Sequence, residues 1–289
     1  MSLRILVTGV SGFTGRHLSE FLNNNRQHDL YYTDTAFGGA DICRCDLRDP
    51  KMVLATIEEL KPQQVYHLAG SFSQDYETDY AANVLSTRNI LEAVLHSKLE
   101  TRVLLVGSAA EYGAIRPGDN PVKETQPLNP ASVYGLTKAY QTHLMNYYVQ
   151  AHGMNIVMAR PFNLLGRGLN KSLFVGRVYE QIDAFKKGEI SCIELGNLDS
   201  YRDYVRVESA VEDYARIMEH GETGNVYHVA SGKPVQMREL LAQILKEESV
   251  PFDKVREDAG RNPGKFNVPS IYADVSKIEA LRSAINSIK

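Results

Sequence analysis

A tyrosine and a lysine four residues apart are the first residues of this chain that could do chemistry. Tyr134 and Lys138 stand in a stretch with helical spacing, so we expect both side chains on one face of a long helix. A phenol ordinarily has a pKa of about 10, and a neighbouring ammonium stabilises the phenolate and lowers that pKa. Tyr134 could then exchange a proton with an alcohol oxygen near neutral pH. Because the same spacing arises in ordinary amphipathic helices, the pair alone does not decide the chemistry.

Ser108 is a third candidate for the same proton transfer. It follows the apolar run 103–106 and Gly107, at the carboxyl end of a predicted strand. Open parallel sheets bind their ligands at that end. We therefore expect the Ser108 hydroxyl to hydrogen-bond the reacting oxygen and to share its proton with Tyr134.

Three glycines mark the turn between the first predicted strand and the first predicted helix. Gly9 permits a tight turn, Gly12 lets the backbone approach a pyrophosphate, and Gly15 allows close packing of helix on strand. The helix that follows offers unpaired N–H groups and the positive end of its dipole to phosphates. This context predicts a dinucleotide site, and a glycine-rich turn without a ligand is the alternative.

Acidic residues after the second strand bear on which dinucleotide binds. Asp34 comes 19 residues after Gly15, where a carboxylate can accept hydrogen bonds from both adenosine ribose hydroxyls and would repel a 2′-phosphate. We therefore expect NAD as the cofactor, with NADP as the alternative. Asp46 and Leu47 lie where a small loop could cover the adenine. A simple turn at Asp34 and an Asx turn at Asp46 remain open.

The elements that must position these residues follow an alternating pattern. Strands are predicted at residues 3–8, 29–33, 65–69, 103–106 and 156–159, and helices at 13–23, 50–60, 83–96 and 134–151. Strands that are apolar throughout and are separated by amphipathic helices indicate a parallel sheet covered on both faces. The predicted fold class is α/β, with a doubly wound parallel (Rossmann) sheet.

The alternation stops after residue 163, which predicts a smaller mixed α/β C-terminal substrate domain. Its expected elements are a helix at 174–185, an extended segment at 190–195 and a helix at 237–248, while 226–229 returns a late strand to the main sheet. The dinucleotide-binding domain is assigned to residues 1–163 and 202–231, and the second domain to residues 164–201 and 232–289.

Composition excludes several classes of protein. The 289 residues include 32 Lys plus Arg and 35 Asp plus Glu, so a net charge of −3 lacks the basic footprint of a nucleic-acid binder. No apolar run approaches the roughly 18 residues of a membrane span, and the N-terminal run is shorter than that of a signal peptide. Cys43, Cys45 and Cys192 are too few for a disulfide framework and have no matching Cys/His pair. We expect a cytoplasmic protein without a metal.

Motifs in the same order along nearly the whole chain resemble the extended short-chain dehydrogenase/reductase family, the NAD-dependent epimerases and dehydratases of nucleotide sugars. These are Thr8-Gly9-x-x-Gly12-Phe13-x-Gly15, His67-Leu68-Ala69, Asn83-Val84, Gly107-Ser108-x-x-Glu111-Tyr112-Gly113, Pro130-x-x-x-Tyr134-Gly135-x-x-Lys138, Arg160-Pro161-Phe162-Asn163 and Arg202-Asp203-Tyr204. Three segments, at residues 162–166, 195–203 and 224–232, are similar to the subgroup of GDP-4-keto-6-deoxy-D-mannose reductases.

The resemblance implies roles for individual residues. The catalytic residues would be Ser108, Tyr134 and Lys138. The residues that bind the cofactor would be Gly9, Gly12, Phe13, Gly15, Asp34, Asp46, Leu47, Leu68, Ala69, Tyr134, Lys138 and Pro161. The residues that bind the substrate would be Ser108, Asn163, Arg202 and Arg261. Asn163 and Arg202 match positions that contact the substrate diphosphate. Asn83 would orient the catalytic helix or a water that relays protons. Two structural alternatives stay open: Arg202 could pair with Asp199 or Asp203, and Asn83 could be a helix N-cap.

Departures from the family pattern narrow the reaction. Ala110 stands where related 4,6-dehydratases carry an acidic residue, so we do not expect dehydration. Glu111 is present, but the alternation of side chains at a strand end should turn it away from Ser108. No cysteine lies near Ser108 to form the Cys/His pair of related epimerase/reductases. Leu164 and Arg206 replace the His and Asp usual in the reductase subgroup, which leaves the sugar and the nucleotide open.

Three functions remain. The first is a reductase that transfers hydride between NAD(P) and C4 of a 4-keto-6-deoxy sugar nucleotide. The second is a nucleotide-sugar 4-epimerase with retained NAD, and the third is a dinucleotide-sensing protein without catalysis. In relatives the helices at residues 83–96 and 134–151 pair across a two-fold axis, so the resemblance also implies a homodimer.

Overall fold

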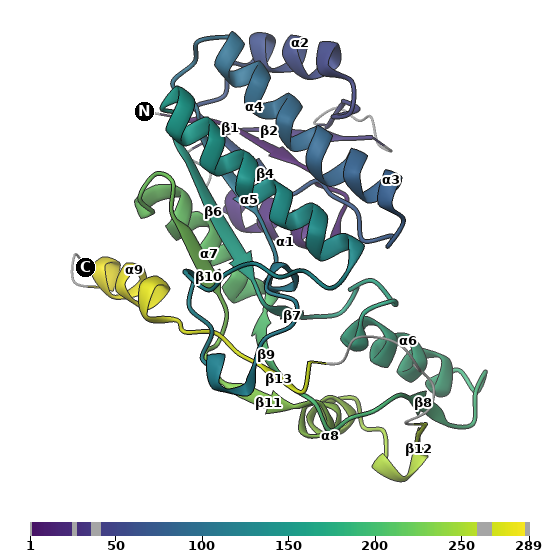
Figure 1. Ribbon diagram of the computed structural model, residues 1–289. Helices are drawn as coiled ribbons and strands as arrows, with labels where there is room; N and C mark the ends of the chain where they lie inside the picture. Colours follow the sequence, from purple (N-terminus) through teal and green to yellow (C-terminus); the bar gives the residue numbers. More distant parts are fainter. Residues whose placement is uncertain (1, 25–27, 36–41, 259–267, 287–289) are drawn as a thin grey trace.

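The computed structural model describes residues 2–24, 28–35, 42–258 and 268–286. Within these ranges, seven strands form one parallel sheet in the order β10-β6-β5-β4-β1-β2-β3 (Figure 1). They are β1 (Arg4–Thr8), β2 (Asp29–Asp34), β3 (Ile42–Arg44), β4 (Gln64–His67), β5 (Arg102–Val106), β6 (Ile156–Pro161) and β10 (Val226–Val229). The order reverses between β1 and β4, as a doubly wound sheet requires. The predicted fold class is confirmed, and β3 is the strand that the prediction missed.

Helices cover both faces of this sheet. One face carries α2 (Pro50–Leu60), α4 (Ser86–His96) and α5 (Val133–His152), and the other carries α1 (Phe13–Asn24), α7 (Val207–His220) and α9 (Ser276–Asn286). Successive strand residues supply the two cores: Ile5 and Val7 pack with α1 and α7, whereas Leu6 packs with α2 and α4. This alternation is why neighbouring residues in the middle of these strands are apolar on both faces of the sheet.

The segment before α4 is longer than the periodicity predicted. The helix α3 (Tyr76–Asp79) and the π-helix η1 (Tyr80–Leu85) precede α4, and the Asp75 side chain accepts a hydrogen bond from the Thr78 N–H at the start of α3. Asn83 therefore lies inside a helical segment, and its interpretation as an N-cap is wrong. Such π-turns widen a helix and often mark functional positions.

A smaller lobe lies beyond the carboxyl ends of the sheet strands (Figure 1). It contains β7 (Asn163–Leu165), β9 (Tyr201–Arg206), β11 (Pro234–Gln236) and β13 (Ser270–Ile271) in one sheet, the pair β8 (Ile193–Leu195) and β12 (Val255–Glu257), and the helices α6 (Phe174–Lys186) and α8 (Met237–Glu247). Short 3-10 turns η2 (Ala109–Glu111), η3 (Pro117–Asp119) and η4 (Phe252–Lys254) complete the elements of the described ranges. Val178, Ile182, Leu241 and Ile244 form the core of α6 and α8.

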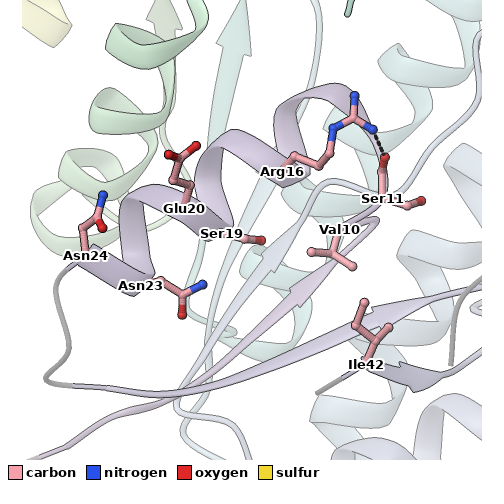
Figure 2. Close-up of a pocket in the computed structure, with 8 residues that line it drawn as sticks. All are labelled: Val10, Ser11, Arg16, Ser19, Glu20, Asn23, Asn24 and Ile42. Atoms are coloured by element: carbon pink, nitrogen blue, oxygen red, sulfur yellow. Dashed lines mark hydrogen bonds between the residues drawn. The ribbon is translucent and has the colours of Figure 1, made fainter. Parts of the chain in front are cut away.

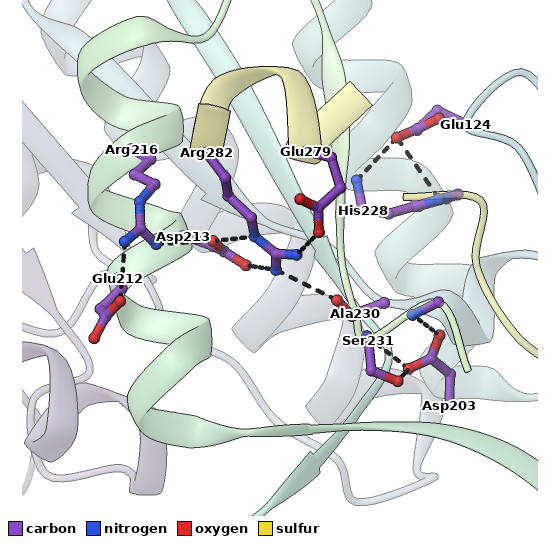
Figure 3. Close-up of polar contacts among 11 residues, drawn as sticks. Glu124, Asp203, Glu212, Asp213, Arg216, His228, Ala230, Ser231, Glu279 and Arg282 are labelled. Carbon is purple, nitrogen blue, oxygen red and sulfur yellow. Dashed lines mark hydrogen bonds and ion pairs between the residues drawn. The ribbon is translucent and has the colours of Figure 1, made fainter. Parts of the chain in front are cut away.

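Polar contacts join the two parts of the chain (Figure 3). Arg282 of α9 donates to the Asp213 carboxylate of α7, with Nε–Oδ1 at 3.1 Å, so α9 packs beside the parallel sheet. Asp203 of β9 accepts hydrogen bonds from the backbone N–H groups of Ser231 and Gly232, just after β10. The division into two domains at residues 163, 202 and 232 stays a prediction. Across the described ranges, no helix combines the length and apolarity that a membrane span needs.

Candidate active site

The glycine loop has the close contacts that its spacing predicted. Gly9 has φ +71°, and a Cβ on it would lie 2.7 Å from the backbone of Ala69. A Cβ on Gly15 would lie 2.2 Å from the Gly9 carbonyl oxygen, and one on Gly12 3.2 Å from the same atom. Side chains at these positions would push α1 away from β1 and fill the space where a pyrophosphate fits.

A cavity of about 360 Å³ opens beside this loop. Its lining contains seven of the predicted cofactor residues, Gly9, Gly12, Asp34, Asp46, Leu47, Leu68 and Ala69. It also contains residues that the sequence reasoning did not select, Ser11, Thr33, Thr35, Cys45, Arg48, Gly70, Ala82 and Ser86. A carboxylate at the end of β2 beside a glycine cradle fits an adenosine dinucleotide.

The other five predicted cofactor residues do not line this cavity: Phe13, Gly15, Tyr134, Lys138 and Pro161. The Phe13 ring lies against Gly166, whose Cβ would be 2.9 Å from the Phe13 Cζ, and it contacts the His17 ring edge to face. Pro161 is buried at the end of β6.

The two carboxylates of the cavity are held by neighbouring residues. Asp34 Oδ2 accepts hydrogen bonds from Ser11 Oγ at 2.6 Å and Ser11 N at 3.1 Å, which ties β2 to the glycine loop. Asp46 accepts from the Arg48 guanidinium at 2.7 Å and from the Arg48 N–H at 3.0 Å, so the predicted Asx turn is present. The hydrogen bond from Arg48 holds the pKa of Asp46 below its usual value.

A second, wider hollow of about 580 Å³ lies on the other side of Ser11 (Figure 2). Five of its lining residues, all with polar side chains, come from α1, and one of them, Arg16, donates to the Ser11 carbonyl at 2.7 Å. Val10 and Ile42 form its floor beneath the helix. Ser11 therefore separates this hollow from the cofactor cavity, because it lines both.

The structure brings the three predicted catalytic side chains together. Ser108 follows β5, and its side chain hydrogen-bonds the phenol of Tyr134 in the first turn of α5. Ser132 caps this helix by accepting from the Gly135 N–H at 3.0 Å. Lys138 Nζ lies 5.8 Å from the centre of the Tyr134 ring and donates to the Val106 carbonyl at 2.9 Å.

The pKa of Tyr134 moves in the direction opposite to our expectation. Burial raises it to about 12, and the hydrogen bond with Ser108 offsets only part of that effect. Burial also lowers the pKa of Lys138 to about 8, while Glu111 and Asp79 raise it. The prediction that Lys138 lowers the pKa of Tyr134 is therefore corrected: desolvation of the phenol is the largest effect, and the lowering contribution comes from Ser108.

Asn83 and Gly70 complete the site, and the sequence reasoning left the first unassigned and missed the second. Asn83 Oδ1 accepts from the Ser71 N–H at 2.8 Å, and its Nδ2 donates to Thr137 Oγ1 at 2.9 Å. A Cβ on Gly70 would lie 2.6 Å from Asn83 Oδ1 and 3.5 Å from Lys138 Nζ. Gly70 was detectable only as the residue after the His67-Leu68-Ala69 motif.

Glu111 does not turn away from Ser108, so that expectation is wrong. Its carboxylate is fully buried and accepts a hydrogen bond from the Ser108 N–H at 2.7 Å. The 3-10 turn η2 begins at Ala109 with Ser108 as its N-cap, and a turn does not continue the two-residue alternation of a strand.

Two of the predicted substrate residues, Asn163 and Arg202, lie in the smaller lobe. Within the described residues Arg202 forms no ion pair, because Asp199 pairs with Arg238 at 3.2 Å and Asp203 accepts from Ser231. Burial lowers the pKa of Arg202, whose Nη1 donates to the Tyr201 carbonyl. The exposed Asn163 donates to the Asp203 carbonyl at 3.0 Å. Arg261 lies outside the described residues.

Residues 5–230 match the NAD dependent epimerase/dehydratase family. The chain belongs to this family. It is 30% identical over 265 residues to GDP-6-deoxy-D-mannose reductase of Pseudomonas aeruginosa, covering 90% of this chain and 84% of the relative. It is also 31% identical to GDP-6-deoxy-D-talose 4-dehydrogenase of Aggregatibacter actinomycetemcomitans. That alignment covers 96% of this chain and 90% of the relative.

The solved structure of RMD from Pseudomonas aeruginosa complexed with NADPH is similar over 98% of this chain and 92% of its own, with 27% identity and a TM-score of 0.84. The family resemblance, the Rossmann fold and the expectation of an NAD(P)-dependent enzyme are confirmed. Among the residues that the structure describes, no three His, Cys, Asp or Glu side chains gather as metal ligands.

Proposed function

We propose that this member of the epimerase/dehydratase family is a reductase that acts at C4 of a 4-keto-6-deoxy sugar carried on a nucleoside diphosphate, with GDP as the first candidate. The observation that carries the proposal is the contact of Ser108 with Tyr134, one helical turn from Lys138. Gly70 links this group to the glycine-lined cavity, because it lines the cavity and its Cβ would lie 3.5 Å from Lys138 Nζ. The two relatives at about 30% identity are named for redox chemistry on GDP-6-deoxy sugars, which supports the sugar and the nucleotide.

The proton that completes the reduction would come from Tyr134. When bound, the reduced nicotinamide supplies the hydride, and the C4 oxygen then needs one proton. A phenol with a pKa near 12 is protonated at neutral pH and is ready to donate. Ser108 would hold the C4 oxygen, and Lys138, protonated below about pH 8, would stabilise the phenolate that remains.

Arg202 is the proposed ligand of the substrate diphosphate, together with Asn163. Arg202 is half-buried, and its guanidinium is paired only with a carbonyl among the described residues, so a phosphate would provide the missing negative charge. Arg261 stays proposed as a residue on the nucleotide side.

NAD is the proposed cofactor, with NADP as the alternative. Asp34 stands at the end of β2 and borders the cavity, where its carboxylate would repel a 2′-phosphate. The similar structure from Pseudomonas aeruginosa contains NADPH, which supports the alternative. Competition of NADH and NADPH for the same protein measures the preference directly.

The redox stoichiometry separates the reductase from a 4-epimerase with retained NAD, which Asp34 also suits. Incubation with GDP-4-keto-6-deoxy-D-mannose and NADH or NADPH should consume one reduced cofactor for each product formed. Product formed without net oxidation of the cofactor would favour the epimerase, and cofactor binding with no turnover of any nucleotide sugar would favour the sensing protein.

Tyr134→Phe tests the mechanism. This variant should bind the cofactor as the wild type does and lose about 100-fold or more in kcat, because it removes only the proton donor. Turnover at the wild-type rate would rule out Tyr134 as the acid.

We further propose a homodimer in the cytoplasm, joined through the outer faces of α4 and α5. Tyr76 and Tyr147 lie near these helices with 42% and 56% of their surface exposed, which is unusual for large aromatic residues. Light scattering on the purified protein would give the mass, and a monomer at micromolar concentration would contradict this assembly.

A further inference from the structure

The carboxylate of Glu111 is fully buried, and both of its oxygen atoms accept hydrogen bonds. Oε1 accepts from the Ser108 N–H at 2.7 Å. Oε2 accepts from Thr142 Oγ1 at 2.6 Å and from Arg160 Nη2 at 2.7 Å. The charge is thus paired with a guanidinium that is itself only 1% exposed.

These donors come from separate parts of the site. Ser108 belongs to the turn after β5, Arg160 to β6, and Thr142 to α5. Thr142 lies one helical turn after Lys138 and two turns after Tyr134, on the same face of the helix. Glu111 therefore connects the backbone of the proposed oxygen-binding serine directly to the helix that carries the proposed acid.

The chain makes room for this carboxylate at Gly107. A Cβ on Gly107 would lie 2.4 Å from Glu111 Oε1 and 3.1 Å from the Met158 sulfur. Arg160 is fixed in turn, because its Nη1 donates to the Tyr112 hydroxyl at 2.8 Å and that hydroxyl contacts His228 Nε2 at 2.6 Å. The space beside Gly107 and the fixed Arg160 side chain together determine where the Glu111 carboxylate lies.

A local role in the 3-10 turn does not require this arrangement. A Ser-x-x-Glu capping box needs only the contact with the Ser108 backbone, and such boxes are commonly exposed to water. Burying a carboxylate with an arginine contributes little to stability, since desolvation offsets most of the attraction. The contacts of Glu111 with α5 and β6 therefore need another explanation, and we find it in the positions of the groups that Glu111 connects.

We propose that Glu111 is a positioning residue that keeps the Ser108 hydroxyl in register with the Tyr134 phenol. This inference rests on the proposed function, because it concerns the same proton transfer. The donors to Glu111 are Ser108, Thr142 and Arg160, and none of them lines the cavity, so a substitution of Glu111 would leave cofactor binding unchanged. The charge of Glu111 also raises the pKa of Lys138, so kcat is compared at pH 6, where Lys138 is protonated and the effect on kcat is the one transmitted through Ser108.

A double-mutant cycle tests this role. Glu111→Gln should lower kcat by about tenfold to 100-fold, the range expected when a catalytic group is displaced by about 1 Å. The KM for the cofactor should stay within about twofold. In a Ser108→Ala background the same substitution should change kcat by less than about twofold, since the group through which Glu111 acts is already gone. Product formation is followed over hours, so that the low kcat of the Ser108→Ala variants can be measured.

Asp213→Asn is the matched control. Asp213 is also a buried carboxylate, 1% exposed and paired with Arg282, but it lies between α7 and α9. The Asp213→Asn substitution should lower the melting temperature without changing kcat. An equal loss of kcat from Glu111→Gln in both backgrounds, or no loss in the wild-type background, would overturn the proposal.

Thr142→Val decides the question if Glu111→Gln does not fold or if the Ser108→Ala background is too slow to measure. It removes one hydrogen bond to Glu111 and keeps the volume of the side chain. The proposal requires a fall in kcat of several-fold with an unchanged KM for the cofactor, and unchanged kcat overturns it. Failure of the proposed function would look different, because the wild-type protein would then reduce no nucleotide sugar.

Discussion

Single residues in this site depend on burial as much as on their neighbours in the sequence. Tyr134 and Lys138 are one turn apart, and that spacing was readable from the chain. Their surroundings were not, because the contacts that exclude water come from Ser108, Asn83 and Gly70 in other segments. Burial disfavours both charged forms, so the phenol holds its proton more tightly and the ammonium holds its proton less tightly.

The pH dependence of the reduction follows from Lys138. Its pKa is lowered to about 8, so it is protonated at neutral pH and loses its proton as the pH rises through that value. We expect kcat for reduction to be level from pH 6 to about 7.5 and to fall above about pH 8, while Tyr134 remains protonated. A pH profile of kcat at saturating substrate measures this. A rate that stays level to pH 10 would contradict the role of Lys138.

A second pH effect concerns stability and comes from His67. This fully buried ring contacts Thr8 Oγ1 at 2.9 Å and Thr87 Oγ1 at 3.1 Å, and burial lowers its pKa to about 3. The unfolded chain binds a proton below about pH 6.5 that the folded chain does not bind. The free energy of unfolding should therefore decrease by up to about 1.4 kcal/mol per pH unit as the pH falls from 6.5 toward 3.

Urea unfolding at pH 7, 6 and 5 checks this contribution. His67→Gln should show a smaller pH slope than the wild type, whereas His143→Gln, at an exposed position of α5, should leave the slope unchanged. Equal slopes in all three proteins would show that another group is responsible.

Among the helices and strands, those with a regular apolar pattern were predicted from the sequence, whereas short or polar elements were missed. The strands of the main sheet that lie in its interior were predicted, as was α2, which Asp49 caps in the structure. The short edge strand β3 (Ile42–Arg44) was missed because its side chains are only partly buried. The helix α3 was missed because Tyr76-Glu77-Thr78-Asp79 has no apolar face, and tertiary contacts support it instead.

The packing of α1 on β1 gives a prediction at this scale. Gly15→Ala should destabilise the fold by about 1–3 kcal/mol, because its Cβ would meet the Gly9 carbonyl and neither backbone can move freely. It should also weaken cofactor binding by about tenfold or more, because the glycine loop would be displaced. Thermal unfolding and cofactor titration measure the two effects.

Gly118→Ala is the control for this substitution. Gly118 is exposed in η3, and its Cβ would have no atom within 4 Å. It should change neither measurement. If Gly15→Ala behaved like the control, the close approach of α1 to the glycine loop would not be needed.

For the whole molecule, Asp203 joins the main sheet to the smaller lobe. Its fully buried carboxylate accepts from Ser231 Oγ at 2.6 Å, from Ser231 N at 2.8 Å, from Gly232 N at 2.9 Å and from Ala273 N at 3.2 Å (Figure 3 shows its contact with Ser231). These donors follow β10 and β13, so one side chain fixes the position of β9, which also carries Arg202.

Asp203→Asn should therefore affect the two ligands unequally. An amide has one oxygen to accept where the carboxylate has two, so we expect a loss of about 2 kcal/mol or more in stability. Nucleotide-sugar affinity should fall more than cofactor affinity, because the substitution disturbs β9 rather than the glycine loop. Asp199→Asn, which removes an exposed ion pair with Arg238, is the control. Equal losses for both ligands would contradict this division of binding.

The sequence by itself determined the fold class, the glycine loop and the family, and it proposed Ser108, Tyr134 and Lys138 as the catalytic set. These inferences depend on residue patterns within single strands, turns and helices and on the order of those patterns along the chain. Only the tertiary structure decided the direction of the Tyr134 pKa shift, the burial of Glu111 against Arg160 and Thr142, and the absence of an ion pair for Arg202 among the described residues. These properties depend on which distant segments exclude water from a side chain and supply its hydrogen bonds, and no local pattern contains that information.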